Sequence, residues 1–167
     1  MKIIRATESH RNDFVDTHTR SLRESYESFL PQEWLEETIA NYSNFDKWIN
    51  DERAELWLCY ESGSPIGLVV FGQLRDADAL GSDGEIWSIY FRQKAKGRGY
   101  AKTTLEFAES KLKEKGCTKI YVWCLEQNKR ARNFYENKNN YQATSTRKDQ
   151  ILAGVPYNEI RFEKELI

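Results

Sequence analysis

The sequence predicts a mixed α/β domain in which a twisted sheet of six or seven strands is flanked by about four helices. The first observation is periodicity: short segments with the two-residue repeat of strands alternate with longer segments whose apolar residues recur every three or four positions. The second is a succession of strand, basic loop, helix and strand from Gly84 to Leu125, which predicts two parallel strands. The third is size, because 167 residues suffice for one core, and we expect a single domain over residues 1–167.

The N-terminal part is predicted to hold one strand and two helices. β-Branched residues mark a short strand from Lys2 to Ala6. Apolar and aromatic residues then recur at helical spacing from Glu8 to Phe29, and Pro31 ends this helix. A second helix is predicted from Gln32 to Trp48. Aromatic residues at this spacing are more often core, and the alternative is that the two helices form one wall of a pocket.

A hairpin and an acidic connection follow. The segment from Ala54 to Tyr60 alternates as a strand with one buried face, and a more apolar strand runs from Ile66 to Leu74 after a turn of Ser, Gly and Pro. The connection from Arg75 to Gly84 carries several carboxylates. Such loops are usually only solvated, but beside a ligand these carboxylates would favour a cationic substrate.

Composition excludes several classes of protein. The longest uncharged stretch is too short to span a bilayer, and no apolar leader is expected at the N-terminus, so we expect a cytoplasmic protein without a membrane partner. A net charge of −1 argues against a nucleic-acid partner. The three cysteines have no metal-ligand spacing and are expected to be reduced. Cys124 could be a nucleophile, but no histidine pairs with it in the pattern, which favours a structural thiol.

The loop from Arg92 to Lys102 has the chemistry of a phosphate site. It carries five cations and no carboxylate. Gly97 and Gly99 allow positive φ angles and a close approach of the backbone, and a helix begins directly afterwards. The unpaired N–H groups at a helix start, together with the helix dipole, favour an anion such as phosphate. An ordinary tight turn with solvated lysines would look similar.

The rest of the chain completes the predicted sheet. A helix is expected from Gly99 to Lys115 and a strand from Cys117 to Leu125. A further helix from Asn128 to Glu136 has Asn128 as a good N-cap. Asn140 can take the left-handed conformation that ends this helix. Two last strands are expected from Tyr141 to Arg147 and from Val155 to Glu163.

Two of these motifs resemble one family. The loop from Lys96 to Ala101 resembles the pyrophosphate loop of the GNAT family of N-acetyltransferases, whose pattern is Gln/Arg-x-x-Gly-x-Gly/Ala. Gly99 and Ala101 match that pattern, whereas Lys96 replaces the usual Gln or Arg. Asn-x-x-Ala-x-x-x-Tyr, from Asn128 to Tyr135, resembles the second cofactor-side motif of the same family. The resemblance covers nearly the whole chain and implies the GNAT fold, in which a pair of parallel strands splays apart.

The resemblance implies acetyl-CoA as a cosubstrate that binds where the two parallel strands diverge. Its pantetheine would pair with the backbone of Ile89, Tyr90 and Phe91, as an added strand does. Asn128 would meet the pantetheine or the pyrophosphate. The pyrophosphate would bind the loop and the helix start, that is, Lys96, Gly97, Arg98, Gly99, Tyr100, Ala101 and Lys102.

Glu85 and Tyr135 are the expected catalytic residues. Glu85 is a carboxylate in an otherwise apolar strand, and partial burial would raise its pKa toward that of a general base; the alternative is a solvent-facing strand end. The resemblance favours the base, since many members of the family place theirs on this strand. It also implies that Tyr135 lies near the sulfur, where its phenol could protonate the leaving thiolate. A main-chain N–H could stabilise the oxyanion, and no metal is called for.

The expected activity is direct transfer of an acetyl group from acetyl-CoA to a primary amine in a ternary complex. The acidic connection favours a small cationic amine. The expected acceptor-site residues are Arg23, Tyr26, Phe29, Trp34 and Trp87. The alternative is an acyl-CoA-binding sensor or interaction module without catalysis. Homodimers are common in the family, so a homodimer is one expectation for the oligomeric state.

Overall fold

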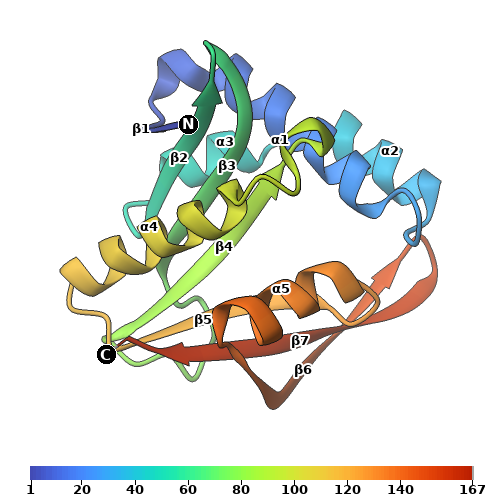
Figure 1. Cartoon of the computed structure of the whole chain (residues 1–167). Coiled ribbons are helices and arrows are strands. Elements are labelled where there is room, and N and C mark those ends of the chain that lie inside the picture. Colours follow the sequence, from blue (N-terminus) through green and yellow to red (C-terminus); the bar gives the residue numbers. More distant parts are fainter. Residues whose placement is uncertain (167) are drawn as a thin grey trace.

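Seven strands form one mixed sheet in the order β1-β2-β3-β4-β5-β7-β6 (Figure 1). The computed structural model describes residues 1–166. The strands are β1 Lys2–Arg5, β2 Ala54–Glu61, β3 Ser64–Gln73, β4 Asp83–Phe91, β5 Lys119–Leu125, β6 Gln142–Leu152 and β7 Val155–Glu165. Neighbouring strands are antiparallel except for the parallel pair β4 and β5. This arrangement confirms the predicted mixed sheet.

Five α-helices and two short 3₁₀-helices connect the strands. They are η1 Glu8–His10, α1 Arg11–Tyr26, α2 Gln32–Ala40, α3 Asn44–Ile49, η2 Gln93–Ala95, α4 Tyr100–Glu114 and α5 Lys129–Asn139. The expectation of one helix from Gln32 to Trp48 is wrong, because the chain leaves the helix after Ala40 and starts again at Asn44. The break lets the Tyr42 hydroxyl reach Nδ1 of His18, 2.6 Å away.

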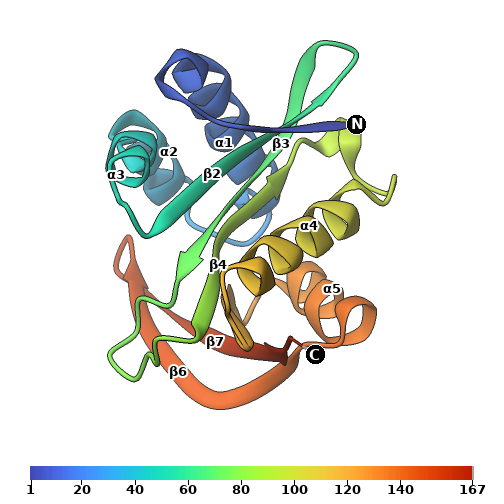
Figure 2. The ribbon, with the colours of Figure 1, turned by 90° about the vertical axis from the view of Figure 1, so that its left-hand side faces the viewer.

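The helices lie on both faces of the sheet (Figure 2). α1 and α3 pack on one face, where Phe14 and Phe45 are fully buried against β2 and β3. α4 and α5 lie on the other, where Leu105 and Leu112 pack against residues of β4, β5 and β7. Helices therefore cover β2 on both sides. The prediction that β2 has only one buried face is therefore wrong, because Cys59, on the other face, is also fully buried.

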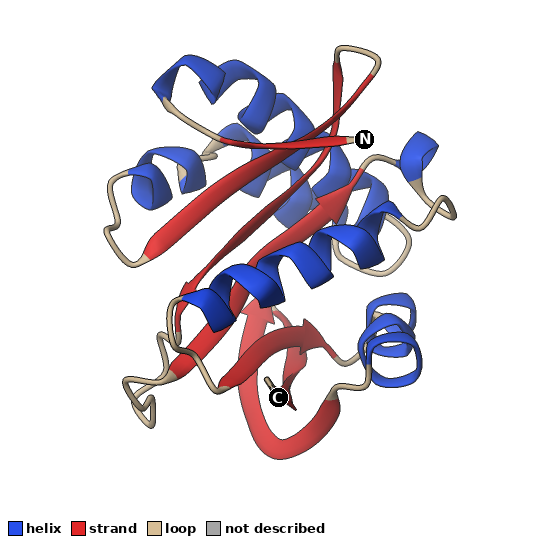
Figure 3. Ribbon diagram, turned by 60° about the vertical axis from the view of Figure 1, so that its left-hand side comes forward, coloured by secondary structure: helices blue, strands red, loops and turns tan. Residues whose placement is uncertain are grey.

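The parallel pair β4 and β5 diverges after four residue pairs (Figure 3). Asp83–Ile86 of β4 pair with Lys119–Val122 of β5. From Trp87 on β4 and Trp123 on β5 onward, no residue pairing joins the two strands in the described chain. Each strand then presents an edge with unpaired backbone groups to the gap. The expected splayed pair of parallel strands is confirmed.

His18 is buried between α1 and β4. Its side chain lies between the hydroxyls of Tyr42 and Ser88, with Nε2 3.3 Å from the Ser88 oxygen, and it is 2% exposed. Burial lowers the pKa of the imidazole to about 3, because the charged form would lose its hydration. His18 is therefore neutral in the folded protein at neutral pH.

Acid is expected to destabilise the fold partly through His18. The unfolded histidine takes up a proton near pH ~6.5, whereas the folded one resists protonation down to a pKa of about 3. Between these values the unfolded state binds more protons, so this contribution to the free energy of unfolding falls as pH falls, by up to about 1.4 kcal/mol per pH unit. Urea titrations at several pH values should show that the free energy of unfolding falls less steeply with acid in His18→Gln than in the wild type. Above pH ~7 the two curves of this free energy against pH should be parallel. Equal slopes for both proteins would contradict the neutral buried histidine.

Candidate functional site

A cavity of about 830 Å³ lies where β4 and β5 diverge. Residues 89–91 of β4 form one part of its wall. The loop before α4 and the first turn of that helix form a second part, and the start of α5 forms a third. The end of α1 and Phe29 complete the lining. The structure thus brings together the strand, the basic loop and the Asn128 helix start, which the sequence analysis identified separately.

The backbone of the basic loop has the predicted geometry. Gly97 and Gly99 have φ angles of 82° and 79°, and Gly99 is the N-cap of α4. An added Cβ at either glycine would meet no atom within 4 Å, so the space in front of the loop is open. Within residues 1–166 the backbone N–H groups from 97 to 102 have no hydrogen-bond partner; the first N–H with a partner is that of Thr103, 3.1 Å from the carbonyl of Gly99. The loop therefore offers a run of free donors at a helix start.

Five cations line the cavity: Lys96, Lys102, Lys129, Arg130 and Lys138. Partial burial, followed by the nearby charge of Arg130, lowers the pKa of Lys96. Glu24 also lines the cavity, but its carboxylate pairs with Arg92 at 3.0 Å. The site therefore favours a polyanionic ligand.

The Arg98 side chain turns away from the cavity, whereas Tyr100, which shares its partner, still lines it. Arg98 donates through Nη1 to Glu61 at 2.5 Å, and the Tyr100 hydroxyl donates to the same carboxylate. The Arg98 side chain is not among the lining groups, although the neighbouring residues are. The expected ligand contact by the Arg98 side chain is therefore not supported. Its backbone N–H remains free in the loop.

Asn128 and Tyr135 occupy the α5 side of the cavity. Asn128 caps the helix, with Oδ1 accepting from the N–H of Ala131 at 3.0 Å. Tyr135 is 5% exposed and lies on the same side of the cavity. Burial raises the pKa of Tyr135 well above the usual value, so the phenol is protonated at neutral pH. The cavity is therefore lined on this side by a protonated phenol.

Further polar side chains lie close to Tyr135 at the divergence of the strands. The hydroxyls of Tyr26 on α1 and Tyr90 on β4 are 2.6 Å apart. Burial raises the pKa of Tyr26 to about 12 and that of the Cys124 thiol to about 12. Cys124 is therefore a neutral thiol, as a structural role requires.

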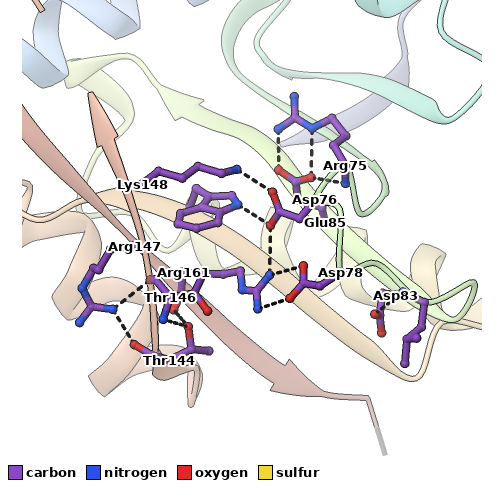
Figure 4. Close-up of polar contacts among 12 residues, drawn as sticks. Arg75, Asp76, Asp78, Asp83, Glu85, Thr144, Thr146, Arg147, Lys148 and Arg161 are labelled. Carbon is purple, nitrogen blue, oxygen red and sulfur yellow. Dashed lines mark hydrogen bonds and ion pairs between the residues drawn. The ribbon is translucent and has the colours of Figure 1, made fainter. Parts of the chain in front are cut away.

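Glu85 does not have the surroundings of an available base (Figure 4). Its side chain is 2% exposed and pairs with Arg75. The Glu85 carboxylate accepts from the Arg75 backbone N–H at 3.1 Å, from Nε at 3.0 Å and from Nη2 at 2.5 Å. It lies on the paired segment of β4, outside the lining of the cavity. The geometry therefore does not support the expected general-base role, because a base needs a lone pair that faces the substrate.

The expected acceptor-site residues lie in three separate places. Tyr26, Phe29 and Trp34 pack into one cluster with apolar residues from β5, β6 and β7. Trp87 belongs to another cluster, and the guanidinium of Arg75 lies 4.3 Å from its ring centre. Arg23 is exposed on α1. The structure thus places three of the five residues together.

The acidic β3–β4 loop, residues 74–82, does not offer free carboxylates to a substrate. Asp76 pairs with Lys148 at 2.6 Å and with Arg161 at 3.2 Å. Asp78 also pairs with Arg161, at 2.8 Å. The chain's own cations therefore neutralise these charges, which removes the basis for expecting a cationic substrate. Their partners lie more than 70 residues away in sequence, where no local pattern could reveal them.

Neither metal ligands nor a membrane-crossing helix is found in the described part of the chain. No three His, Cys, Asp or Glu side chains of residues 1–166 gather closely enough to hold a metal ion. None of the helices of residues 1–166 has the length and apolar run that a bilayer crossing needs.

Comparisons with known proteins agree with this geometry. The chain is 30% identical over 118 residues to the uncharacterized N-acetyltransferase YuaI of Bacillus subtilis. The matched segment spans 70% of this chain and 66% of that relative.

Solved structures share the fold. The PaiA N-acetyltransferase of Thermoplasma acidophilum, solved in complex with coenzyme A, superposes with a TM-score of 0.78 at 18% identity and covers 98% of both chains. An N-acetyltransferase of Staphylococcus aureus has a TM-score of 0.72 at 19% identity, with 99% of this chain and 98% of that chain covered. The model of the acetyltransferase (GNAT) family matches residues 19–141. The chain therefore belongs to the acetyltransferase (GNAT) family.

Proposed function

We propose that this protein transfers an acetyl group from acetyl-CoA to a primary amine, by direct attack within a ternary complex. One observation carries the proposal: the free N–H groups of residues 97–102 and five cations surround a cavity at the divergence of two parallel strands. This set of groups fits the pyrophosphate and the 3′-phosphate of coenzyme A. The edge of β4 at residues 89–91 fits its amide-containing pantetheine.

Each group of the cavity has a separate part in the proposed reaction. The loop N–H groups and Lys96 bind the pyrophosphate and fix the carrier in register with β4. A free N–H on the edge of β4 donates to the thioester oxygen as negative charge develops on it. The neutral amine nitrogen forms the new C–N bond, the C–S bond breaks, and Tyr135 gives its phenolic proton to the departing sulfur; the proton that the nitrogen then loses to form the amide returns to the Tyr135 phenolate through solvent. The ammonium proton of the acceptor is lost to water, since Glu85 is already bound to Arg75.

The acceptor is proposed to be a small primary amine that carries an apolar or aromatic group. Its site would lie beside Tyr26, Phe29 and Trp34, whose cluster borders the divergence of the strands. Three further expectations remain predictions: a single domain over residues 1–167, cytoplasmic residence and a homodimer.

Thiol release from acetyl-CoA, measured across a panel of primary amines, tests the proposed function. We expect release that depends on the amine, with an N-acetylated product of matching mass. Binding of acetyl-CoA in calorimetry without thiol release for any amine would instead support the acyl-CoA sensor. Absence of both binding and release would contradict the cavity assignment.

The cations of the cavity are expected to carry much of the affinity. The double variant Lys96→Gln/Arg130→Gln should raise the dissociation constant of acetyl-CoA roughly tenfold, because both side chains face the anionic carrier. The loss should shrink at high salt, where charges are screened. Calorimetry at two salt concentrations measures it. Lys94→Gln is the matched control, since Lys94 is exposed and does not line the cavity. If Lys94→Gln raised the dissociation constant as much as the double variant does, the proposed location of the phosphates would be refuted.

A further inference from the structure

The β3–β4 loop connects the two halves of the sheet at the point where they separate (Figure 4). Arg75 holds β4 through the hydrogen bonds of its backbone and guanidinium to Glu85. The next residue, Asp76, holds the other half of the sheet. Its carboxylate accepts from the Trp123 indole on β5 at 2.9 Å, from Lys148 on β6 at 2.6 Å and from Arg161 on β7 at 3.2 Å.

These contacts lie at the start of the divergence. The last paired residues are Ile86 of β4 and Val122 of β5. Trp87, which packs under Arg75, and Trp123, which donates to Asp76, are the first unpaired residues of the two strands. Trp87 is also the extra residue of a bulge, because Val70 pairs with Ser88 and Phe71 with Ile86. A bulge bends its strand, so β4 turns away from β5 at the residue that Arg75 covers.

On that face of the sheet two sets of contacts join the halves: this loop, and the cluster in which Tyr26, Phe29 and Trp34 pack with residues of β5, β6 and β7. Four residue pairs join β4 to β5, whereas β7 pairs with seven residues of β5. α4 and α5 pack on the opposite face. The side chains of Asp76 and Arg161 are each 10% exposed, and Asp78 adds two bonds of 2.8 Å to Arg161. Burial would raise the pKa of Asp76, but Lys148, Trp123 and Arg161 lower it overall, so these two cations and the indole N–H hold the carboxylate in its charged form.

We propose that Asp76, together with Arg75, is a positioning residue that fixes how far β4 and β5 diverge and thereby the width of the acetyl-CoA site. The identity of the ligand in this inference rests on the proposed function. The constraint on the divergence of β4 and β5 rests on the fold alone. Removing the charge of Asp76 leaves the buried Arg161 with Asp78 as its remaining ionic partner, which is costly for a buried guanidinium, and it also removes the partner of the half-exposed Lys148. The second half of the sheet then moves more freely, because only the four β4–β5 residue pairs and the cluster around Tyr26, Phe29 and Trp34 still hold it on this face. Tyr135, whose helix packs on that half, no longer keeps a fixed distance from β4.

Asp76→Asn tests this inference with two independent measurements. Amide hydrogen exchange should become faster in residues 87–91 and 123–125 and stay unchanged in α1. The dissociation constant of acetyl-CoA should rise roughly tenfold, and turnover at saturation should fall as well, since contacts within one network couple strongly. Asp76→Glu should partly restore the slow amide exchange and also the affinity and turnover. Asp16→Asn is the matched control, because it removes a carboxylate from the exposed pair with Arg20, 2.7 Å apart on α1.

The outcomes separate this inference from the proposed function. Faster exchange in Asp76→Asn with unchanged affinity and turnover would overturn the positioning role, as would unchanged exchange. If the wild-type protein does not bind acetyl-CoA, the proposed function fails, while the exchange data still decide whether Asp76 fixes the divergence. If Asp76→Asn does not fold, Lys148→Gln is the second variant. It removes only one partner of Asp76, at a side chain that is 44% exposed, and it should show the same effects at a smaller size.

Discussion

Replacing Gly99 with tryptophan is expected to abolish acetyl-CoA binding, with a loss of affinity of at least roughly 100-fold. Gly99 is the N-cap of α4, and the space where its side chain would begin is open. Gly99 lines the cavity in the middle of the run of free N–H groups, where the pyrophosphate is proposed to bind. An indole would fill it and hold the phosphates away from their donors. Calorimetric titration of the folded variant with acetyl-CoA measures the loss.

The positive φ angle of Gly99 requires a matched control, because any side chain at such a residue strains the backbone. Gly63 has the same φ of 79°, also with no atom within 4 Å of an added Cβ, and it lies in the β2–β3 turn. Gly63→Trp should therefore show a similar change in thermal stability with normal acetyl-CoA affinity. If Gly99→Trp binds acetyl-CoA as the wild type does, the assignment of the loop is wrong.

Removing the hydroxyl of Tyr135 is expected to lower turnover roughly 100-fold, the usual contribution of a positioned proton donor. The phenol lines the cavity, and burial keeps it protonated. Tyr135→Phe keeps the ring, which packs against Phe134 and Tyr141, so the dissociation constant of acetyl-CoA should change by less than about twofold. Steady-state kinetics and calorimetry on the same preparation separate the two effects.

Tyr141→Phe is the control for losing a buried hydroxyl next to the site. The Tyr141 hydroxyl donates to Glu109 at 2.9 Å, and this residue does not line the cavity. Its loss should reduce the free energy of unfolding by about 1 kcal/mol and leave turnover unchanged. Equal losses of affinity and turnover in Tyr135→Phe would show that the phenol is structural.

Local chemistry explains what could be predicted from the sequence. Positive φ at Gly97 and Gly99, the Asn128 cap and the left-handed Asn140, with a φ of 60°, all depend on residues within a few positions of each other. The loop before α4 could therefore be predicted in its geometry as well as its chemistry. The strand, helix and strand unit predicted the parallel pair, and the resemblance implied that this pair splays apart.

Contacts between residues far apart in sequence explain what the sequence could not show. The strand pattern identified Glu85. It gave no sign that Arg75, ten residues earlier at the other end of the β3–β4 loop, would pair with this carboxylate. The acidic connection was visible, whereas its partners Lys148 and Arg161 come from strands more than 70 residues away. The cations of α5 were visible in the sequence too, but only the packing of that helix beside the basic loop brings Lys129, Arg130 and Lys138 to the cavity.

A crystal structure of the protein with acetyl-CoA tests the central claim most directly. The account predicts pyrophosphate oxygens within hydrogen-bond distance of the backbone N–H groups of residues 97–102. It also predicts the thioester between residues 89–91 and the Tyr135 hydroxyl. Acetyl-CoA bound outside the divergence of β4 and β5, or with its phosphates away from this loop, would contradict it.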